Sequence, residues 1–151
     1  MRSKIIAALL PLLITVFIAG CASSGASRTT DRDAVHVDVD LTVLSETVLS
    51  AELMNIIVNS DDYIGKTIRV AGTYFYIFYE PTGQIYHYVI TKQGDACCQE
   101  GLEFIWNGEH VFPDDYPATG TPIELIGVFS RDESESIRFF YLATDDIQTL
   151  G

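Results

Sequence analysis

The stretch TIRVAGTYFYIF, residues 67–78, decides the fold of this chain. It is rich in β-branched and aromatic residues, which are the types that fit a pleated strand. Gly72 stands in its middle, where the missing side chain permits a bulge or a sharp coil of the strand. A long first strand that bends at a glycine favours a small sheet that closes on itself.

Four further strands are expected downstream, over residues 84–91, 102–106, 121–130 and 137–143. The turn Pro81-Thr82-Gly83 precedes the first of them, because proline and glycine supply the backbone angles that turns need. Residues 107–120 contain two prolines and two glycines and therefore predict a loop. Residues 131–136 are polar and predict the turn between the last two strands.

Two elements are expected upstream of residue 67. Valine or leucine alternates with polar residues over 35–43, which predicts a short strand with one buried face. A helix is predicted near 47–59, with Ser45 or Thr47 as its N-cap and a stop at 59–62. Its apolar residues have helical spacing and are expected to pack on the sheet: Leu49, Leu53, Ile56 and Ile57.

Together these elements predict a mainly β fold over residues 35–151. Five strands with a coiled first strand resemble the OB-fold, a small five-stranded barrel. The expected architecture is an OB-like five-stranded barrel with one N-terminal helix and a preceding short strand. OB-folds usually place a helix between the third and fourth strands, whereas this chain has the loop 107–120 there. We therefore expect the helix near 47–59 to plug the barrel end instead.

The N-terminal segment has the features of a targeting signal. A cationic start is followed by an apolar run that is shorter than the ~20 residues of a membrane-spanning helix. The segment Ile18-Ala19-Gly20-Cys21 resembles the lipobox of bacterial lipoproteins. The resemblance implies that residues 1–20 are a lipoprotein signal peptide and that Cys21 is lipidated after cleavage. Residues 21–34 contain no large apolar residue and predict a flexible tether.

The charge of the chain limits its partners. The formal net charge is −12, and removal of Arg2 and Lys4 with the signal peptide makes it −14. Nucleic-acid binding depends on lysine and arginine side chains that neutralise phosphates. We therefore expect no nucleic acid as a partner, and we expect the lipid on Cys21 to attach the protein to a membrane.

Further segments extend the resemblance over the domain. They are Asp38-Val39-Asp40-Leu41-Thr42, DYIGKT at 62–67, DACCQEGLEF at 95–104 and Pro113-Asp114-Asp115-Tyr116-Pro117. With the lipobox, they are similar to a group of uncharacterised bacterial lipoproteins that have OB-like domains. The resemblance implies the fold and an extracytoplasmic, lipid-anchored location at the cell membrane or outer membrane. It implies no activity, substrate or cofactor.

If Cys21 carries lipid, Cys97 and Cys98 are the remaining thiols of the chain. Burial as small apolar side chains is the simplest role for them. A vicinal disulfide is a second role in an oxidising compartment, although its ring is strained. A redox role is a third, but no adjacent lysine or arginine lowers a thiol pKa, and the neighbouring carboxylates raise it.

A zinc or copper site is the fourth role for Cys97 and Cys98. Zinc sites usually separate their cysteines by two to four residues, whereas these two are adjacent. Additional ligands are available from His87, His110, Asp95 or Glu103. No other cofactor is expected.

Six aromatic residues fall on the first three long strands: Tyr74, Tyr76, Tyr86, Tyr88, Phe104 and Trp106. A small barrel needs such side chains in its core, which is their simplest role. In OB-folds the same strands also bind oligomers by stacking. Tyr86, Tyr88 and Trp106 are therefore candidates for a ligand face, with a sugar or peptide as the ligand.

Motifs for catalysis do not occur in the sequence. There is no glycine-rich phosphate loop, no His-Glu metal pair on a helix and no serine elbow. Glu103 and the pair Asp114-Asp115 offer carboxylates for acid–base chemistry, but surface carboxylates are common in so acidic a chain.

The sequence therefore favours a lipid-anchored binding or interaction module over an enzyme. Its ligand class stays open between a small molecule, a glycan and a protein. A metal-binding envelope protein that uses Cys97 and Cys98 with a histidine is one alternative. An accessory subunit of a membrane complex is the other.

Overall fold

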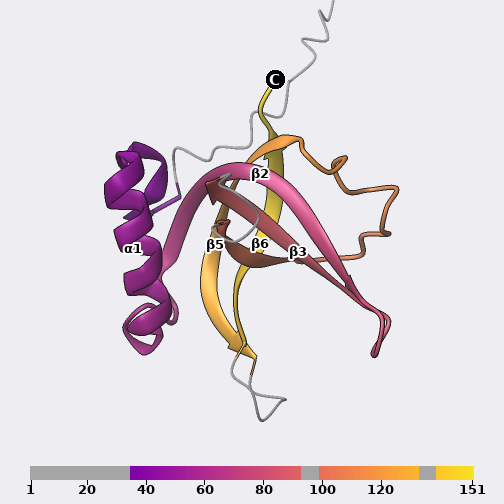
Figure 1. The fold of residues 1–151 in the computed structure, drawn as a ribbon, viewed down its shortest axis with the longest axis horizontal. Helices are drawn as coiled ribbons and strands as arrows, with labels where there is room; N and C mark the ends of the chain where they lie inside the picture. The colour runs from indigo at the N-terminus through magenta and orange to yellow at the C-terminus, as the bar shows by residue number, and fades with distance from the viewer. Residues whose placement is uncertain (1–34, 93–98, 133–138) are drawn as a thin grey trace, which may run out of the picture. The chain divides into compact units, whose positions relative to one another are not determined.

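A strand of 13 residues, β2 (Thr67–Tyr79), is the central element of the fold (Figure 1). The computed structural model describes residues 35–92, 99–132 and 139–151. Over Thr67–Thr73, β2 pairs antiparallel with β5 (Pro122–Asp132), and over Thr73–Tyr79 it pairs antiparallel with β3 (Gln84–Lys92). Since β2 changes partner at Thr73, it has to bend there.

The remaining strands close a ring. β3 pairs antiparallel with β4 (Glu100–Trp106), and β4 pairs parallel with β6 (Phe139–Thr149). β6 then pairs antiparallel with β5, which returns to β2. A short sixth strand, β1 (Val39–Asp40), lies parallel to β2. Over the described residues the fold is thus mainly β: a six-stranded sheet in which five strands form a closed ring, with one α-helix, α1 (Glu46–Val58).

Gly72 makes the bend of β2 possible by its lack of a side chain. A Cβ atom at Gly72 would lie 2.4 Å from the carbonyl oxygen of Ile90 in β3. The pairing of β2 with β3 and β5 is continuous through this point, so Gly72 gives a close approach and not a bulge. The irregular pairings occur instead in β3–β4, between Ile90 and Lys92, and in β5–β6, between Leu125 and Gly127.

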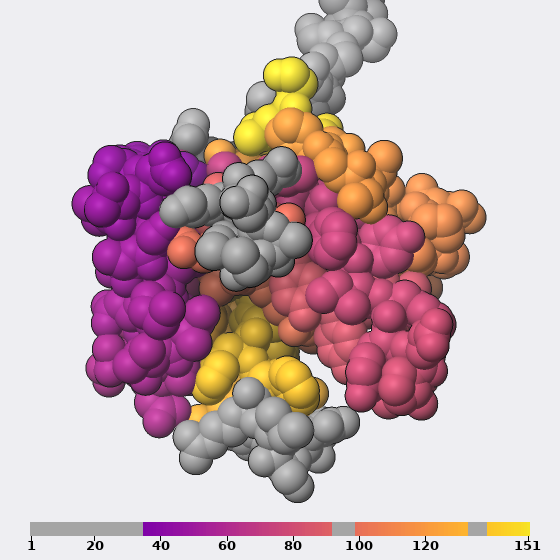
Figure 2. Space-filling model, viewed as in Figure 1, coloured from indigo at the N-terminus to yellow at the C-terminus, as the bar shows by residue number. Residues whose placement is uncertain are grey.

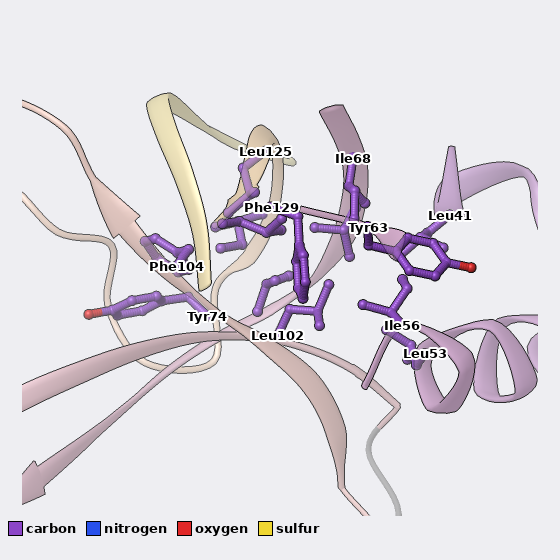
Figure 3. Close-up of a cluster of buried hydrophobic side chains, with 14 residues drawn as sticks. Leu41, Leu53, Ile56, Tyr63, Ile68, Tyr74, Leu102, Phe104, Leu125 and Phe129 are labelled. Atoms are coloured by element: carbon purple, nitrogen blue, oxygen red, sulfur yellow. The ribbon is translucent and has the colours of Figure 1, made fainter. Parts of the chain in front are cut away.

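The core fills the ring and continues to the helix. Tyr74, Phe104, Leu125, Phe129 and Leu142 are almost completely buried. Figure 3 shows Leu53 and Ile56 of α1 pointing toward the side chains of the strands, as part of the same cluster. The buried stripe of α1 is therefore core packing, as predicted.

Two details of the predicted N-terminal elements are wrong. Residues 35–43 form a strand only at Val39–Asp40, and Leu41–Val43 form a 3-10 turn. The Asp40 carboxylate accepts hydrogen bonds from the backbone N–H and the hydroxyl of Thr42, at 2.9 and 2.6 Å, and these bonds favour the turn. Ile57 is 55% exposed, so it lies outside the core.

Other boundaries differ from the prediction by length alone. β6 continues to Thr149, where the prediction ended the strand at residue 143. Thr144 lies within it, and its buried hydroxyl donates to the carbonyl oxygens of Ile126 and Asp146, which satisfies a polar group in the core. Among the described residues, no helix is both long enough and apolar enough to span a bilayer. The predicted signal peptide, Cys21 and the tether lie outside those residues.

Candidate functional site: a groove around Glu103

Three clefts on the described surface share Glu103 and Phe139 in their linings. Their volumes are about 340, 330 and 200 Å³. We call their union the Glu103 groove and define it by six lining residues: Tyr86, Tyr88, Glu103, Trp106, Asp132 and Phe139. Figure 2 shows the surface hollowed between α1, the β2–β3 hairpin and the first residues of β6.

The pairing of β3 with β4 determines which side chains reach the groove. Tyr88 is opposite Glu103, and the neighbouring pair is His87 with Phe104. Because successive side chains of a strand point to opposite faces, these two pairs lie on opposite faces of the sheet. Phe104 is buried inside the ring, so Tyr88 and Glu103 belong to the outer face.

Glu103 is the acidic centre of the groove. Partial burial raises the pKa of its carboxyl to about 7, and the nearby Asp132 contributes in the same direction, against a hydrogen bond with Tyr88. Burial also raises the pKa of Tyr88 to about 12, with Glu103 adding to the effect, so Tyr88 is a neutral hydroxyl. A carboxyl that titrates near neutral pH can exchange a proton or hold a cation under physiological conditions.

His87 lies behind the groove in a cluster of aromatic rings. It stacks on Tyr116 with ring centres 4.1 Å apart, and its Nδ1 is hydrogen-bonded to the Tyr74 hydroxyl at 2.9 Å. Burial lowers the pKa of His87 to about 4, so the imidazole is neutral at physiological pH. Tyr74 is fully buried, as the core role of the aromatics predicted.

Trp106 is held by contacts from three directions. His110 stacks on it with ring centres 3.7 Å apart, and Tyr116 meets it edge to face at 5.4 Å. Its indole N–H donates to the carbonyl oxygen of Asp145 at 3.3 Å. These contacts fix the orientation of a large ring at one end of the groove.

The structure brings some of the predicted site residues together. Tyr86, Tyr88 and Trp106 are half-buried and line the groove, and His87 lines its largest cleft. His110 is not among the described residues that line the clefts, but it stacks on Trp106, which is. Tyr76, expected in the core, is 37% exposed.

The predicted metal ligands are placed only in part. Cys97, Cys98 and Asp95 lie outside the described residues, so a site that includes them stays a prediction. Within 35–92, 99–132 and 139–151, no group of three or more His, Cys, Asp or Glu residues is placed to hold a metal ion.

The carboxylate candidates differ in their surroundings. Glu103 is part of the groove, whereas Asp114 and Asp115 are exposed in the loop 107–120. Asp115 accepts a hydrogen bond from the backbone N–H of Val111 at 2.6 Å, which gives it a role in the shape of that loop.

Sequence reasoning missed Asp132 and Phe139 as groove residues. They are the last residue of β5 and the first residue of β6, and no local pattern marks them. They reach Glu103 because β6 lies beside β4, a neighbour relation that follows from the strand order of the ring. Comparison of the chain with protein-family models, curated proteins and solved structures finds no match.

Proposed function

We propose that this protein is a lipid-anchored, extracytoplasmic binding module whose OB-like domain holds a ligand in the Glu103 groove. The observation that carries the proposal is the groove itself, in which half-buried aromatic side chains surround a half-buried carboxyl. Small-molecule sites combine apolar and aromatic walls with a few placed polar groups. Its two larger clefts, of about 340 and 330 Å³, fall in the size range of such sites.

The order of the strands supports the OB-like part of the proposal. OB-folds are five-stranded Greek-key barrels that bind ligands on the outer face of their second and third strands. Here the closed ring runs β2-β3-β4-β6-β5, and Tyr86, Tyr88 and Glu103 of the groove lie on the outer face of β3 and β4, the second and third strands of that ring. The helix α1, which precedes the ring, packs its buried stripe on the ring's core.

The lipobox at Ile18–Cys21 supports the anchored part of the proposal. Lipid chains on Cys21, such as diacylglyceryl with an added palmitate, bury enough methylene groups to hold a protein on a bilayer. The polar residues 22–34 would then give the domain reach above that surface.

The test of the groove is a ligand screen with matched variants. The full chain, kept in a non-ionic polyoxyethylene detergent, is screened by ligand-observed NMR against neutral oligosaccharides and short peptides. Trp106→Ala is expected to weaken binding of any hit about tenfold or more, since one stacking ring contributes about 1–3 kcal/mol. Met54→Ala, an exposed change on α1, is the control. A panel without hits, or hits that ignore Trp106→Ala, would contradict the proposal.

A second candidate, an accessory subunit that docks on a membrane complex, is favoured by the β2–β3 hairpin. Five consecutive apolar or aromatic residues of β2, Phe75–Tyr79, are each between 37% and 54% exposed. Exposed apolar patches of this kind often mark interaction surfaces. A photo-crosslinker at Phe78 should capture one defined membrane-complex subunit, whereas the same probe at Met54 should not. Recovery of the protein alone would count against this candidate.

A further inference from the structure

We propose that the Glu103 groove selects an organic cation, a primary ammonium group on a flexible aliphatic stem. This inference rests on the proposed function, because it names the ligand class of the same groove. It follows from the charge of the described lining, the rings around the carboxyl and the partial burial of Glu103.

The described residues that line the groove are acidic on balance. Glu103 and Asp132 both contribute carboxyl groups, and neither lysine nor arginine is among the described residues that line the three clefts. The imidazole of His87 adds no positive charge near neutral pH, because burial lowers its pKa to about 4. A net charge of −12 on the whole chain also attracts cations toward the surface.

The walls of the groove suit a cation with an apolar stem. Rings of Tyr86, Trp106 and Phe139 line the clefts beside the carboxyls. The face of an aromatic ring attracts an ammonium group, and the attraction grows when water is excluded. The same rings bury methylene groups of the stem, at ~0.8 kcal/mol for each buried CH₂.

A bound ammonium group also offsets the free-energy cost of ionising the partly buried Glu103 carboxyl. Burial and Asp132 both disfavour the charged form of Glu103, and a cation at close range favours it. An anion would add a further like charge, and a neutral ligand would leave the cost unchanged. The groove therefore discriminates by charge as well as by shape.

The affinity should depend on the protonation of Glu103. Among the described residues, the titratable groups that line its two larger clefts with it are Tyr79 from β2, Tyr86, His87 and Tyr88 from β3, Tyr116 from the loop 107–120, Asp132 from β5 and Tyr141 from β6. Burial raises the pKa of Tyr88 to about 12, so the hydroxyl opposite Glu103 is neutral near pH 7. As the pH falls below about 7, Glu103 takes up a proton and cation binding weakens.

The experiment compares three probes with the same five-carbon chain: the diamine cadaverine, pentanediol and glutarate. Binding to the full chain in a non-ionic detergent is measured by calorimetry at about pH 8 and about pH 5.5. Cadaverine is expected to bind at least about tenfold more tightly than pentanediol, and glutarate to bind most weakly, since a charged hydrogen bond contributes ~1.5–3 kcal/mol. Cadaverine should bind more weakly at the lower pH.

Two variants that each remove one carboxylate locate the effect. Glu103→Gln should weaken cadaverine binding about tenfold or more and remove most of its pH dependence. Asp62→Asn removes the same charge at an exposed position outside the groove and should leave the affinity within about twofold. Circular dichroism and urea unfolding check that both variants fold.

The outcomes separate this inference from the proposed function. The cation inference is wrong if pentanediol binds as tightly as cadaverine, or if glutarate binds more tightly. If Trp106→Ala then abolishes the binding of pentanediol or glutarate, the proposed ligand groove is still supported. Cadaverine binding that ignores Glu103→Gln overturns the assignment to this groove. If none of the three probes binds, the cation inference is wrong, and the oligosaccharide and peptide screen decides the proposed function by itself.

Discussion

Glu103 reduces the stability of the folded protein at neutral and alkaline pH. Its usual pKa of 4.5 rises to about 7 in the fold, mainly because burial disfavours the charged carboxylate. The folded state therefore binds this proton more tightly than the unfolded state does. Stability falls as the pH rises from about 4.5 to about 7, and the loss is complete above that window.

We predict that Glu103→Gln stabilises the protein at pH 8. The expected gain is about 1 kcal/mol, since solvent reaches part of the side chain and screens the effect. Below about pH 4.5 both side chains are neutral, and the gain should vanish. Urea unfolding at pH 8 and pH 4 measures both values. An equal gain at the two pH values would show that the carboxylate is not the cause.

His87 has the opposite dependence on pH. Its pKa falls from 6.5 to about 4 in the fold because burial disfavours the imidazolium. The contribution of neutral His87 to the free energy of unfolding is therefore fully present above pH 6.5 and is lost as the pH falls toward 4. His87→Phe keeps an aromatic ring beside Tyr116 and removes the titration.

The predicted result for His87→Phe is a shallower loss of stability in acid. The loss between pH 6.5 and pH 4 should be smaller than in the wild type by about 1 kcal/mol, a value reduced for solvent screening. The lost hydrogen bond to Tyr74 costs the same at every pH and does not change this slope. Unfolding in urea across the range gives the slope, and a slope equal to that of the wild type would contradict the prediction.

At the scale of elements, the change of partner along β2 is the feature most open to mutation. The first half of β2 belongs to the pair with β5 and the second half to the pair with β3. Gly72 lies next to the crossover residue Thr73, and its Cα faces the backbone of Ile90 at close range. A side chain there meets backbone atoms, which cannot rotate away.

Gly72→Ala is predicted to destabilise the protein by about 2 kcal/mol or more, since the new methyl group overlaps the Ile90 carbonyl. Gly151→Ala is the matched control, because nothing lies within 4 Å of a Cβ atom at that position. Thermal unfolding of the two variants measures the difference. A Gly72→Ala melting temperature equal to that of the control would rule out the close approach.

The elements show what the sequence can and cannot predict. Residues 67–78 gave a strand because their composition and length are decisive, and β2 ends one residue later. Residues 35–43 alternate as a strand does, but Asp40 bonds to Thr42 and turns the chain at Leu41. The alternation of apolar and polar residues does not show whether such a local hydrogen bond will favour a turn over a strand.

The groove was predictable only in part for a related reason. Tyr86, Tyr88 and Trp106 were identified because aromatic residues on these strands have a known use. The sequence does not distinguish Glu103 from the many surface carboxylates, because its place in the groove depends on Phe139 and Asp132, which β5 and β6 bring beside it. The order of the strands places Glu103 and Asp132 in one groove, and local sequence patterns do not contain that order.

At the scale of the whole molecule, the lipid anchor is the property with the clearest test. If Cys21 is lipidated, Cys21→Ser should abolish lipid attachment. The variant should then either leave the membrane fraction or keep its uncleaved signal peptide. Radiolabelled palmitate and the mass of the N-terminal peptide report the modification. Label that persists in Cys21→Ser would show that another residue carries it. Cys97→Ser is the matched control and should keep the label.

The parallel pairing of β4 with β6 has a consequence for how the chain acquires its groove. Ribosomes make a chain from its N-terminus, so β2 and β3 exist well before residues 139–149 do. Phe104 pairs with Leu142, and until that contact forms, β5 and β6 cannot close the ring beside β4. Long-range pairing of this kind is slow. Since Asp132 and Phe139 line the groove, it is complete only when β5 and β6 have closed the ring, and ligand capture would mark a molecule in which this closure has taken place.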